Sequence, residues 1–540
     1  MATQLRIPVL DVCIIVGYIL LVLFIGVFAS RKTKVTSQVF FLAGRSLPWG
    51  VVGAALFASN ISTIHLIGLT ASGYNEGLVW GNFEWMASFT LILLALVFAP
   101  FYFRSNISTL PEFLERRYSP ASRSILAFMA ILAALFIHIG MSLYAGAIVF
   151  EQFFGINVIA SILIVAGIVS IYTVLGGLKA VVLTESVNTV VLLVGACLIT
   201  AFAFRALPAH GIHTLAQFRA AAKPDQLHML QTHSSAGLNW YAVFLGYPVL
   251  GVWYWCTDQT IVQRVLGART EVDAQLGPLF AGFLKILPVF LLVLPGVIAY
   301  VLFHGLIGNN SNQTLPVLIS QLIPTGLRGL ISAAVLAALM SAVSAALNSS
   351  GTLVAVDIVK RFRPRITDQR LVLVGRVSSI VIMLLAVLWS TQGGRFTSIF
   401  AAINVIASDL APPITTVFLF GVFWRRGTKE ASVVTLLAGF LMGVTSFVLD
   451  LPVFGSSKLI TDGLGISFMM QAWWMFCICS LIFVIVSLFT PPPAEENLKG
   501  LTWSNPLAVI FGPPLRKASD PRIVAALLLL AMIVLYYIFR

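Results

Sequence analysis

The sequence predicts an all-α integral membrane protein, and two observations carry this prediction. Hydrophobic residues make up 59% of the 540 positions and charged residues only 10%, whereas charged residues form about a quarter of an ordinary soluble protein. Apolar stretches of roughly 20 residues, the length that an α-helix needs to cross a bilayer, follow one another along the whole chain. We therefore expect a single membrane domain over 1–540, without a separate soluble domain.

Taken in order, these stretches predict about 14 membrane-spanning helices. They lie at 10–30, 48–73, 78–103, 124–152, 156–176, 181–205, 239–262, 276–305, 328–358, 371–392, 395–424, 430–450, 467–490 and 520–539. The first stretch is longer than the apolar part of a signal peptide, and no small-residue cleavage site precedes the charged RKTK that follows it. We therefore expect a permanent extra helix at 10–30, and we expect the helices of 430–540 to be peripheral.

The loops between the predicted helices differ in charge. About 24 of the 33 lysine and arginine residues fall in loops or helix ends on one side, which the positive-inside rule makes cytoplasmic. Both termini then lie outside a plasma (inner) membrane. Because the basic residues do not gather on one face, the net charge of +13 does not indicate a nucleic-acid partner.

Several classes of chemistry are disfavoured by the motifs of the predicted helices. No HExxH or GxSxG motif lies in a span, as an intramembrane enzyme of those types would need, and no GxxxxGK[ST] loop indicates drive by ATP. All five cysteines fall within predicted helices, so we expect no disulfide framework. The histidines of the outer loop 206–238 are irregularly spaced and have no cysteine beside them, so we expect no metal cofactor.

Two of the predicted helices look interrupted at their centres. The second contains LFASNISTIHLIG (56–68), and the seventh reads FLGYPVLGVWYWCTDQTIVQR (244–264). Glycine, proline and small polar residues are common in membrane helices and often serve only packing. However, the two interruptions lie five spans apart, as in transporters built from two inverted repeats whose first helices break at a binding site. This spacing favours a binding centre and predicts repeats at 48–205 and 239–424.

Ionisable residues inside predicted helices are the strongest local signals, because each costs at least about 2.5 kcal/mol at the bilayer centre unless it is paired or hydrated. The candidates are His65, Glu84, Glu185, Asp258 and Lys285. Glu84 and Lys285 either pair or hydrogen-bond a polyhydroxylated ligand. For Asp258 and Glu185, an interfacial carboxylate with a basic partner such as Arg264 is as good an interpretation as function. His65 is either a neutral core residue or a proton carrier.

Aromatic and small residues complete the predicted centre. Trp253, Tyr254 and Trp255 lie beside the second interruption, where rings could stack on the apolar face of a ligand or, alternatively, mark an interface. The span 328–358 is rich in small residues, which favours close packing. It also places Ser341 on one helix face with Ser344. With backbone carbonyls freed at the first interruption, these hydroxyls could bind a small cation.

Long motifs in this sequence resemble the sodium/solute symporters, and most closely their sodium/glucose cotransporter branch. The resemblance extends over about 39–503. The motifs are FFLAGRSLPWGVVGAALFASNISTIHLIGL, GNFEWMA, IYTVLGGLKAVVLTESVN, WYWCTDQTIVQRVLGA, GFLKILPVF, GLRGLISAAVLAALMSAVSAALNSS and LAPPITTVFLFGVFWRR. It implies fourteen helices, a LeuT-type five-plus-five inverted-repeat core with two broken helices, and transport by alternating access.

The resemblance also implies roles for individual residues. Substrate contacts are expected at Asn60, His65, Glu84, Tyr254, Trp255, Lys285 and Asn404. The outer gate is expected at Leu69, Phe83 and Phe400, with Tyr254 also at the inner gate. Sodium is expected at the carbonyls of Ala58, Ile61 and Ala338 and the hydroxyl of Ser341, with Glu185 and Asp258 as acidic residues related to coupling.

Three positions depart from the pattern of this branch. Ala342 replaces the usual second sodium-binding serine, Glu185 replaces an aspartate, and Asn404 replaces a glutamine. We expect a symporter that imports a hexose or related neutral polyol with sodium as co-substrate, because Glu84 opposite Lys285 disfavours an anionic substrate. The alternatives are proton coupling through His65 or Glu185, an uncoupled sugar carrier or sensor, and another solute such as myo-inositol.

Overall fold

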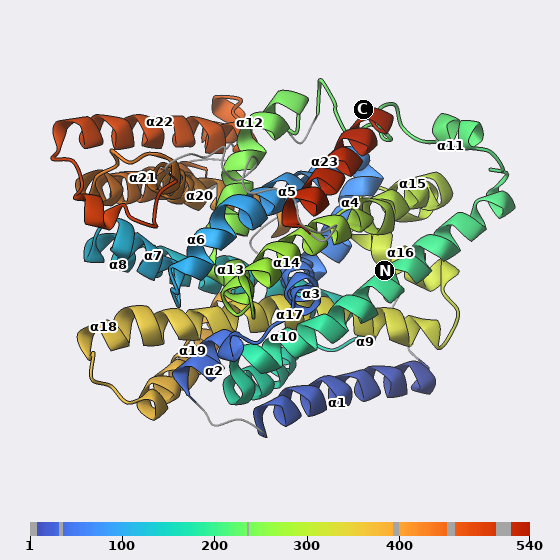
Figure 1. Ribbon diagram of the computed structural model, residues 1–540. Helices are drawn as coiled ribbons and strands as arrows, with labels where there is room; N and C mark the ends of the chain where they lie inside the picture. Colours follow the sequence, from blue (N-terminus) through green and yellow to red (C-terminus); the bar gives the residue numbers. More distant parts are fainter. Residues whose placement is uncertain (1–7, 32–35, 235–236, 393–398, 451–458, 504–519) are drawn as a thin grey trace.

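The computed structural model describes residues 8–31, 36–234, 237–392, 399–450, 459–503 and 520–540 (Figure 1). These residues are almost entirely helical, and the part of the chain so described contains isolated β-bridges but no strand. The predicted all-α membrane class is therefore confirmed.

The helices and half-helices of membrane-spanning segments run along the whole chain (Figure 1). They are α1 (Val9–Arg31), α3 (Trp49–Asn60), α4 (Thr63–Asn75), α5 (Asn82–Leu93), α8 (Pro120–Ala133), α9 (Ser142–Phe154), α10 (Val158–Ala206), α12 (Trp240–Gly251), α13 (Gln259–Leu266), α14 (Glu271–Leu284), α15 (Leu294–Ile307), α17 (Leu327–Thr352), α19 (Asp368–Ser390), α20 (Ile399–Phe423), α21 (Lys429–Leu449), α22 (Phe468–Phe489) and α23 (Pro521–Ile538).

Shorter elements connect or continue them. The short α-helices are α2 (Ser37–Leu42), α6 (Ala99–Arg104), α7 (Leu110–Arg117), α11 (Leu215–Ala221), α16 (Thr314–Leu322) and α18 (Lys360–Phe362). The π-helical segments are η3 (Leu94–Phe98), η4 (Ala134–Met141), η6 (Val252–Thr257), η7 (Val289–Val293), η9 (Leu353–Val359) and η11 (Leu459–Gly463).

The described residues contain 11 helices long and apolar enough to cross a membrane, or 12 when the bent pair α3 and α4 is taken as one span. One long element, α10, covers two predicted spans, 156–176 and 181–205, which meet at a kink where Gly177 has φ 59° and ψ −158°. A side chain at Gly177 would meet the carbonyl of Phe40 at 2.5 Å, so the residue must be glycine for packing as well as for conformation. The total of 14 spans stays a prediction.

The first predicted interruption is a true break between α3 and α4, which meet at 63°. Ile61 and Ser62 leave the helical region of backbone conformation, with ψ at 102° and 174°. Ser62 starts α4 through a capping box in which the N3 residue is His65, a position where glutamate or glutamine is usual. At the break, the contacts between Ser62 and His65 therefore replace helical hydrogen bonds that the backbone no longer makes.

The second interruption follows α12. Pro248 lacks an amide hydrogen, and the chain passes through the π-helical turn η6 before it leaves the helix at Asp258, whose ψ is 125°. The Asp258 carboxylate then accepts a hydrogen bond from the amide of Thr260 and caps α13. The prediction of two broken helices is confirmed.

One helix organises the interior around these breaks. About 94% of the most apolar stretch of Leu327–Phe362, which includes α17, is buried, and α17 packs against α3, α4, α10 and α1. Figure 1 shows α1 at one edge of the molecule and α20, α21 and α22 together on the opposite side, while α23 lies beside α5 and α14. The predicted repeat boundaries and the peripheral placement of 430–540 stay predictions.

Candidate substrate and ion site

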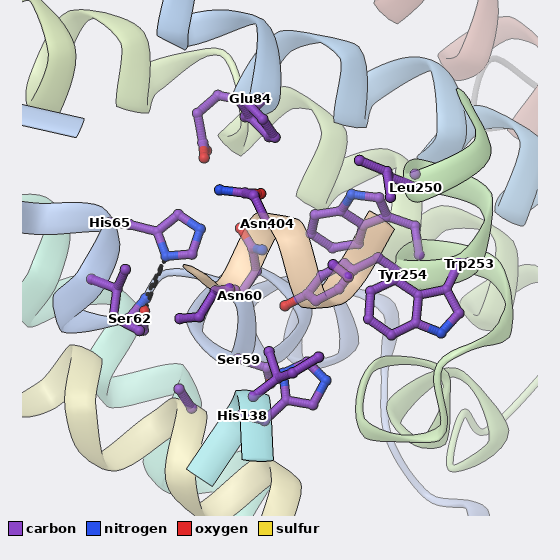
Figure 2. A pocket seen from close by; sticks show the side chains of 18 of the residues that line it. Ser59, Asn60, Ser62, His65, Glu84, His138, Leu250, Trp253, Tyr254 and Asn404 are labelled. Carbon is purple, nitrogen blue, oxygen red and sulfur yellow. Dashed lines mark hydrogen bonds between the residues drawn. The ribbon is translucent and has the colours of Figure 1, made fainter. Parts of the chain in front are cut away.

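A cavity of about 140 Å³ lies between the two helix breaks. One water molecule needs on the order of 10 to 15 Å³ on this measure, so the cavity can hold a small solute. Figure 2 shows side chains from the end of α3, from α4, α5, α20 and the η6 segment converging on it. Its wall includes all predicted substrate residues except Lys285: Asn60, His65, Glu84, Tyr254, Trp255 and Asn404.

Lys285 acts from behind the wall. It lies at the end of α14, where its Nζ donates hydrogen bonds to Glu84 Oε2 and Asn60 Oδ1. Both charged side chains are 1% exposed, and the ammonium lies 5.5 Å from the centre of the Trp255 ring. A buried charge in a membrane must be paired. The predicted pairing of Glu84 with Lys285 is therefore present, and it leaves the wall without net charge.

His65 belongs to the break as much as to the cavity. Its Nδ1 lies 3.3 Å from the amide of Ser62 and 3.0 Å from the Ser62 hydroxyl, contacts that close the capping box (Figure 2). The imidazole is thus oriented by the backbone turn that starts α4. Replacing it would disturb the break as well as the cavity wall.

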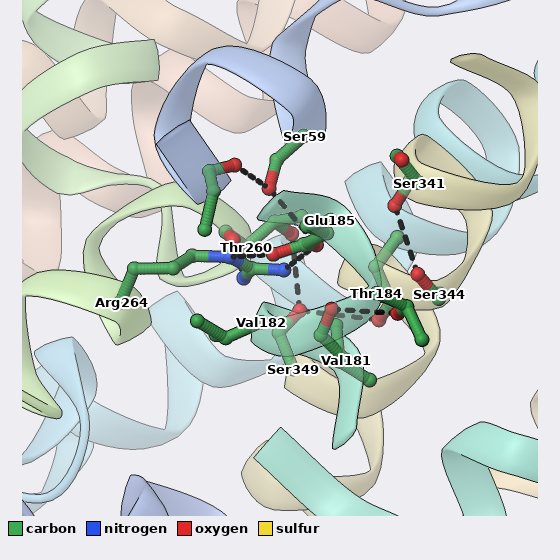
Figure 3. Close-up of polar contacts among 12 residues, drawn as sticks. Ser59, Val181, Val182, Thr184, Glu185, Thr260, Arg264, Ser341, Ser344 and Ser349 are labelled. Carbon is green, nitrogen blue, oxygen red and sulfur yellow. Dashed lines mark hydrogen bonds and ion pairs between the residues drawn. The ribbon is translucent and has the colours of Figure 1, made fainter. Parts of the chain in front are cut away.

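A second buried ion pair contacts Ser59, the residue before Asn60. Glu185 Oε1 accepts from Arg264 Nη2 at 2.5 Å and from the Ser59 hydroxyl at 3.0 Å, and Glu185 Oε2 accepts from Arg264 Nε at 3.3 Å (Figure 3). Neither charged side chain is exposed. The pair joins α10, α13 and α3, so the basic partner suggested for Glu185 by the sequence is the one present.

Asp258 has a different partner from the one expected. Its Oδ2 lies 3.0 Å from Nε2 of His138, a residue of η4 that also lines the cavity and stacks on Trp253 with ring centres 6.5 Å apart. Sequence reasoning missed His138, although the signal was available: it is an ionisable residue in the middle of the predicted span 124–152. Ser142, one turn further, also lines the cavity and was missed.

Comparison with known proteins gives the family. The model of the sodium:solute symporter family matches residues 40–439. The chain belongs to this family. It is accordingly a multi-pass solute symporter of a sodium-coupled family and not an enzyme.

Curated relatives of this symporter have names that specify sugars or inositol. It is 36% identical to the sodium/mannose cotransporter of Bos taurus, over 92% of this chain and 89% of that protein. It is 31% identical to sodium/glucose cotransporter 1 of Oryctolagus cuniculus, over 92% and 81%. It is 33% identical to sodium/myo-inositol cotransporter 2 of the same organism, over 91% and 78%.

Solved structures support the LeuT-type fold of this symporter. A sodium-coupled sialic acid symporter, described as substrate-bound and outward-open, superposes with a TM-score of 0.77 at 20% identity, over 90% of this chain and 99% of that one. Mhp1, a nucleobase-cation-symport-1 family transporter, superposes with a TM-score of 0.55 at 14% identity, over 85% and 97%. At these identities the likeness concerns the fold alone.

The predicted outer gate of the symporter is partly described. Phe83 lines the cavity and stacks on Trp80 at 5.7 Å and on Phe468 at 6.2 Å between ring centres. Leu69 is fully buried on α4. The side chain of Phe400 lies outside the described residues. Tyr254, predicted for the inner gate, lies on the cavity wall in edge contact with Trp255.

The predicted sodium ligands lie where α17 packs against the first break. A continuous helix would direct the amides of Ser62 and His65 to the carbonyls of Ala58 and Ile61, but these amides donate to His65 Nδ1 and Ser62 O. The two carbonyls are thereby released. On α17, the Ser341 hydroxyl donates to the carbonyl of Ala337 at 2.8 Å.

Two further positions on α17 complete this set. Ala338 is fully buried, and its carbonyl belongs to the turn that contains the Ser341 hydroxyl. Ala342, which lacks the oxygen expected from the resemblance, lines the substrate cavity. The place of the missing hydroxyl is therefore next to the space that a substrate would fill.

Proposed function

We propose that this symporter imports a neutral hexose or related polyol together with sodium by alternating access. The observation that carries the proposal is the Glu84–Lys285 pair with Asn60 at the cavity wall. A neutralised pair offers strong acceptors to hydroxyl groups, whereas an anionic substrate would favour an unpaired cation. The sugar and inositol names of the relatives support the same class of substrate.

Each cavity residue then has a role in the proposal. Asn60, Glu84 and Asn404 exchange hydrogen bonds with substrate hydroxyls, while Lys285 holds the first two in place. The Trp255 ring covers an apolar face of the sugar ring, since stacked aromatic rings are suited to C–H surfaces. His65 contributes its second ring nitrogen, and Tyr254 closes the cavity below.

Sodium is proposed to bind the released carbonyls of Ala58 and Ile61, the carbonyl of Ala338 and the hydroxyl of Ser341. With alanine at 342, a water molecule completes the coordination, and the affinity for sodium is low. The proposal includes a plasma (inner) membrane location with both termini outside, on the strength of the charge difference between the loops.

A proton is the second candidate for the coupling ion: a proton gradient instead of a sodium gradient would then drive uptake of the substrate. The missing oxygen at Ala342 favours it, and so does the His138–Asp258 contact on the cavity side of the second break, which joins two titratable groups at 3.0 Å. His65 and Glu185 were the carriers expected from the sequence. Glu185 is tied to Arg264 and Ser59, so a proton there would have to break a charged pair.

The proposal is tested by uptake into proteoliposomes. Labelled D-glucose, D-galactose, D-mannose and myo-inositol are each offered under an inward sodium gradient, an inward proton gradient, or neither. We expect one or more of them to accumulate above equilibrium with sodium alone. Accumulation with protons alone would transfer the coupling to the second candidate, and equilibration without a gradient would leave an uncoupled carrier.

The variant E84Q serves as the site-specific arm of this test. It keeps the shape of the side chain but removes the charge that Lys285 neutralises, so uptake per folded protein, as quantified by gel filtration, should fall strongly. The matched control is E112Q, which breaks a pair between Glu112 and Arg116 at the surface. Unchanged uptake by E84Q would contradict the assigned site.

A further inference from the structure

A chain of hydrogen bonds runs from the extra N-terminal helix to the predicted sodium ligand. The Tyr18 hydroxyl on α1 donates to Asn188 Oδ1 on α10 at 2.7 Å. Asn188 Nδ2 donates to the Ser341 hydroxyl on α17 at 2.7 Å and to the carbonyl of Ala337 at 3.3 Å. Ser341 in turn donates to the same carbonyl. Three helices are thus joined through side chains alone.

The direction of every hydrogen in this chain is fixed by chemistry. The carbonyl of Ala337 can only accept, so the side of the Asn188 amide that faces it must be the NH₂ group. Asn188 Oδ1 then faces Tyr18, which must donate. Because Ser341 accepts from Asn188, its own hydrogen goes to Ala337, and one lone pair of its oxygen stays available for another partner.

The chain is sealed from solvent. Asn188 and Ser341 are not exposed at all, and Tyr18 is 7% exposed. Removing the Tyr18 hydroxyl would leave Asn188 Oδ1 without its hydrogen-bond partner, which is costly for a buried group. The position of the Asn188 side chain, and with it that of the Ser341 hydroxyl, therefore depends in part on Tyr18.

A second contact fixes α1 to the same helix. Asp11 Oδ1 accepts from the amides of Gly326 and Gly329 at 2.9 and 2.6 Å, at the start of α17. A side chain at Gly329 would meet the backbone of Asp11 at 2.7 Å, so the helices approach closely there. Two turns apart along α1, Asp11 thus holds the start of α17 directly, and Tyr18 reaches its interior through Asn188.

Ser341 contributes a larger share of the predicted sodium ligands in this chain than in the family pattern that the chain resembles. Alanine at 342 leaves Ser341 as the one side-chain oxygen among the predicted sodium ligands, the others being backbone carbonyls. Figure 3 shows Ser341 on α17 beside the α10 segment that contains Thr184 and Glu185. Asn188 lies one helical turn beyond Glu185, so the α10 surface that faces α17 orients this oxygen.

We propose that Tyr18 and Asn188 are positioning residues for sodium, so that α1, a helix outside the predicted repeats, sets the sodium affinity of the symporter. This inference rests on the proposed sodium site at Ser341. Asn188 and Tyr18 hold the hydroxyl so that its remaining lone pair faces the cation, and they take no part in substrate binding.

The test is the sodium dependence of substrate uptake by Y18F and N188A. Y18F, which loses one hydrogen bond, should raise the sodium concentration for half-maximal uptake roughly five-fold. N188A, which also loses the bond to Ser341, should raise it at least as much. The maximal rate, and the substrate KM at saturating sodium, should be unchanged. A merely structural role would instead lower the amount of folded protein and the maximal rate without changing the sodium requirement.

The matched control is Y118F. Tyr118 is a buried tyrosine whose hydroxyl likewise donates a hydrogen bond to a neighbouring helix, here to the backbone carbonyl of Val417 at 3.0 Å, but it has no link to Ser341. Its sodium requirement should equal that of the unsubstituted protein. Y18F removes a single oxygen atom and is the milder substitution, so it still tests the proposal if N188A does not fold.

Sodium binding is measured separately from transport, by thermal unfolding of the protein without substrate. The signal is the increase in melting temperature in sodium chloride relative to the same concentration of choline chloride. The midpoint of this rise should shift to higher sodium in Y18F and not in Y118F. An unchanged or lowered midpoint in Y18F, with a sodium-dependent unsubstituted protein, would overturn the positioning role alone. An unsubstituted protein that sodium neither stabilises nor drives would overturn the proposed sodium site and this inference together.

Discussion

Two neighbouring residues at the end of α3, Ser59 and Asn60, each hydrogen-bond a different buried ion pair, and the two pairs have different surroundings. Asn60 contacts Lys285, the partner of Glu84, and Glu84 lies on the cavity wall. Ser59 contacts Glu185, the partner of Arg264, and that pair is absent from the wall.

Both pairs consist of an acid and a base with almost no exposure. The difference teaches that burial and pairing alone do not mark a substrate site. What separates the pairs is whether the acid has a side toward the cavity. We therefore expect the first pair to determine substrate binding and the second to hold α3, α10 and α13 together.

The largest expected effect is in the first pair. E84Q leaves the Lys285 ammonium buried without its counter-charge, which costs folding stability. It also replaces a charged acceptor for substrate hydroxyls by a neutral one, a change of about 1.5 to 3 kcal/mol, so uptake at low substrate should fall roughly 10- to 100-fold. Uptake kinetics, with gel filtration to establish folding, measure the effect. An E84Q protein with normal KM would remove the distinction between the pairs.

The second pair should respond in stability. E185Q leaves Arg264 unpaired and should lower the melting temperature strongly, whereas E185Q/R264Q should recover part of the loss because no charge is left buried alone. Thermal unfolding of both single variants and the double variant gives the coupling energy. Additive losses in the double variant would mean that the pair does not act as a unit.

A smaller effect is expected at the sodium site. A342S supplies the hydroxyl that the resemblance leads one to expect, so it should lower the sodium concentration for half-maximal uptake by up to about ten-fold, the effect of one charge-assisted contact. The control is A345S, at a buried alanine of the same helix that does not line the cavity. No change in A342S would sink the idea that the missing oxygen limits affinity.

The smallest effect is expected at His138. H138Q keeps a hydrogen-bond donor for Asp258 but removes the imidazole ring that faces the cavity and Trp253. The substrate KM should therefore rise only a few-fold, and the sodium requirement should be unchanged. H210Q serves as control, because His210 is exposed and does not line the cavity. A normal KM in H138Q would exclude this side of the cavity from substrate contact.

The sequence was most informative where a residue broke a strong rule. Glu84 and Lys285 stood out because charges in a membrane are costly. Ser62 and Pro248 lie in the two interruptions, which are visible as glycine, proline and small polar residues inside apolar spans. His138 breaks the same rule and was still missed, because its span showed no interruption.

Other features lie beyond single-sequence reasoning. Asn188 is one of several polar residues in TESVNT (184–189), and only the packing of α1 and α17 on α10 shows which partners it has. Likewise, sequence alone could not assign adjacent Ser59 and Asn60 to different ion pairs, because that depends on the direction in which the last turn of α3 faces. The choice of Arg264 for Glu185, but of His138 for Asp258, depends on the same three-dimensional arrangement.

The most direct test of sodium-coupled sugar symport is the uptake of radioactive sodium into proteoliposomes with and without an accepted sugar outside. The account predicts that the sugar accelerates sodium entry, that E84Q abolishes this acceleration, and that E112Q keeps it. Sodium entry unaffected by every accepted sugar, in a protein that still takes the sugar up, would contradict coupled transport.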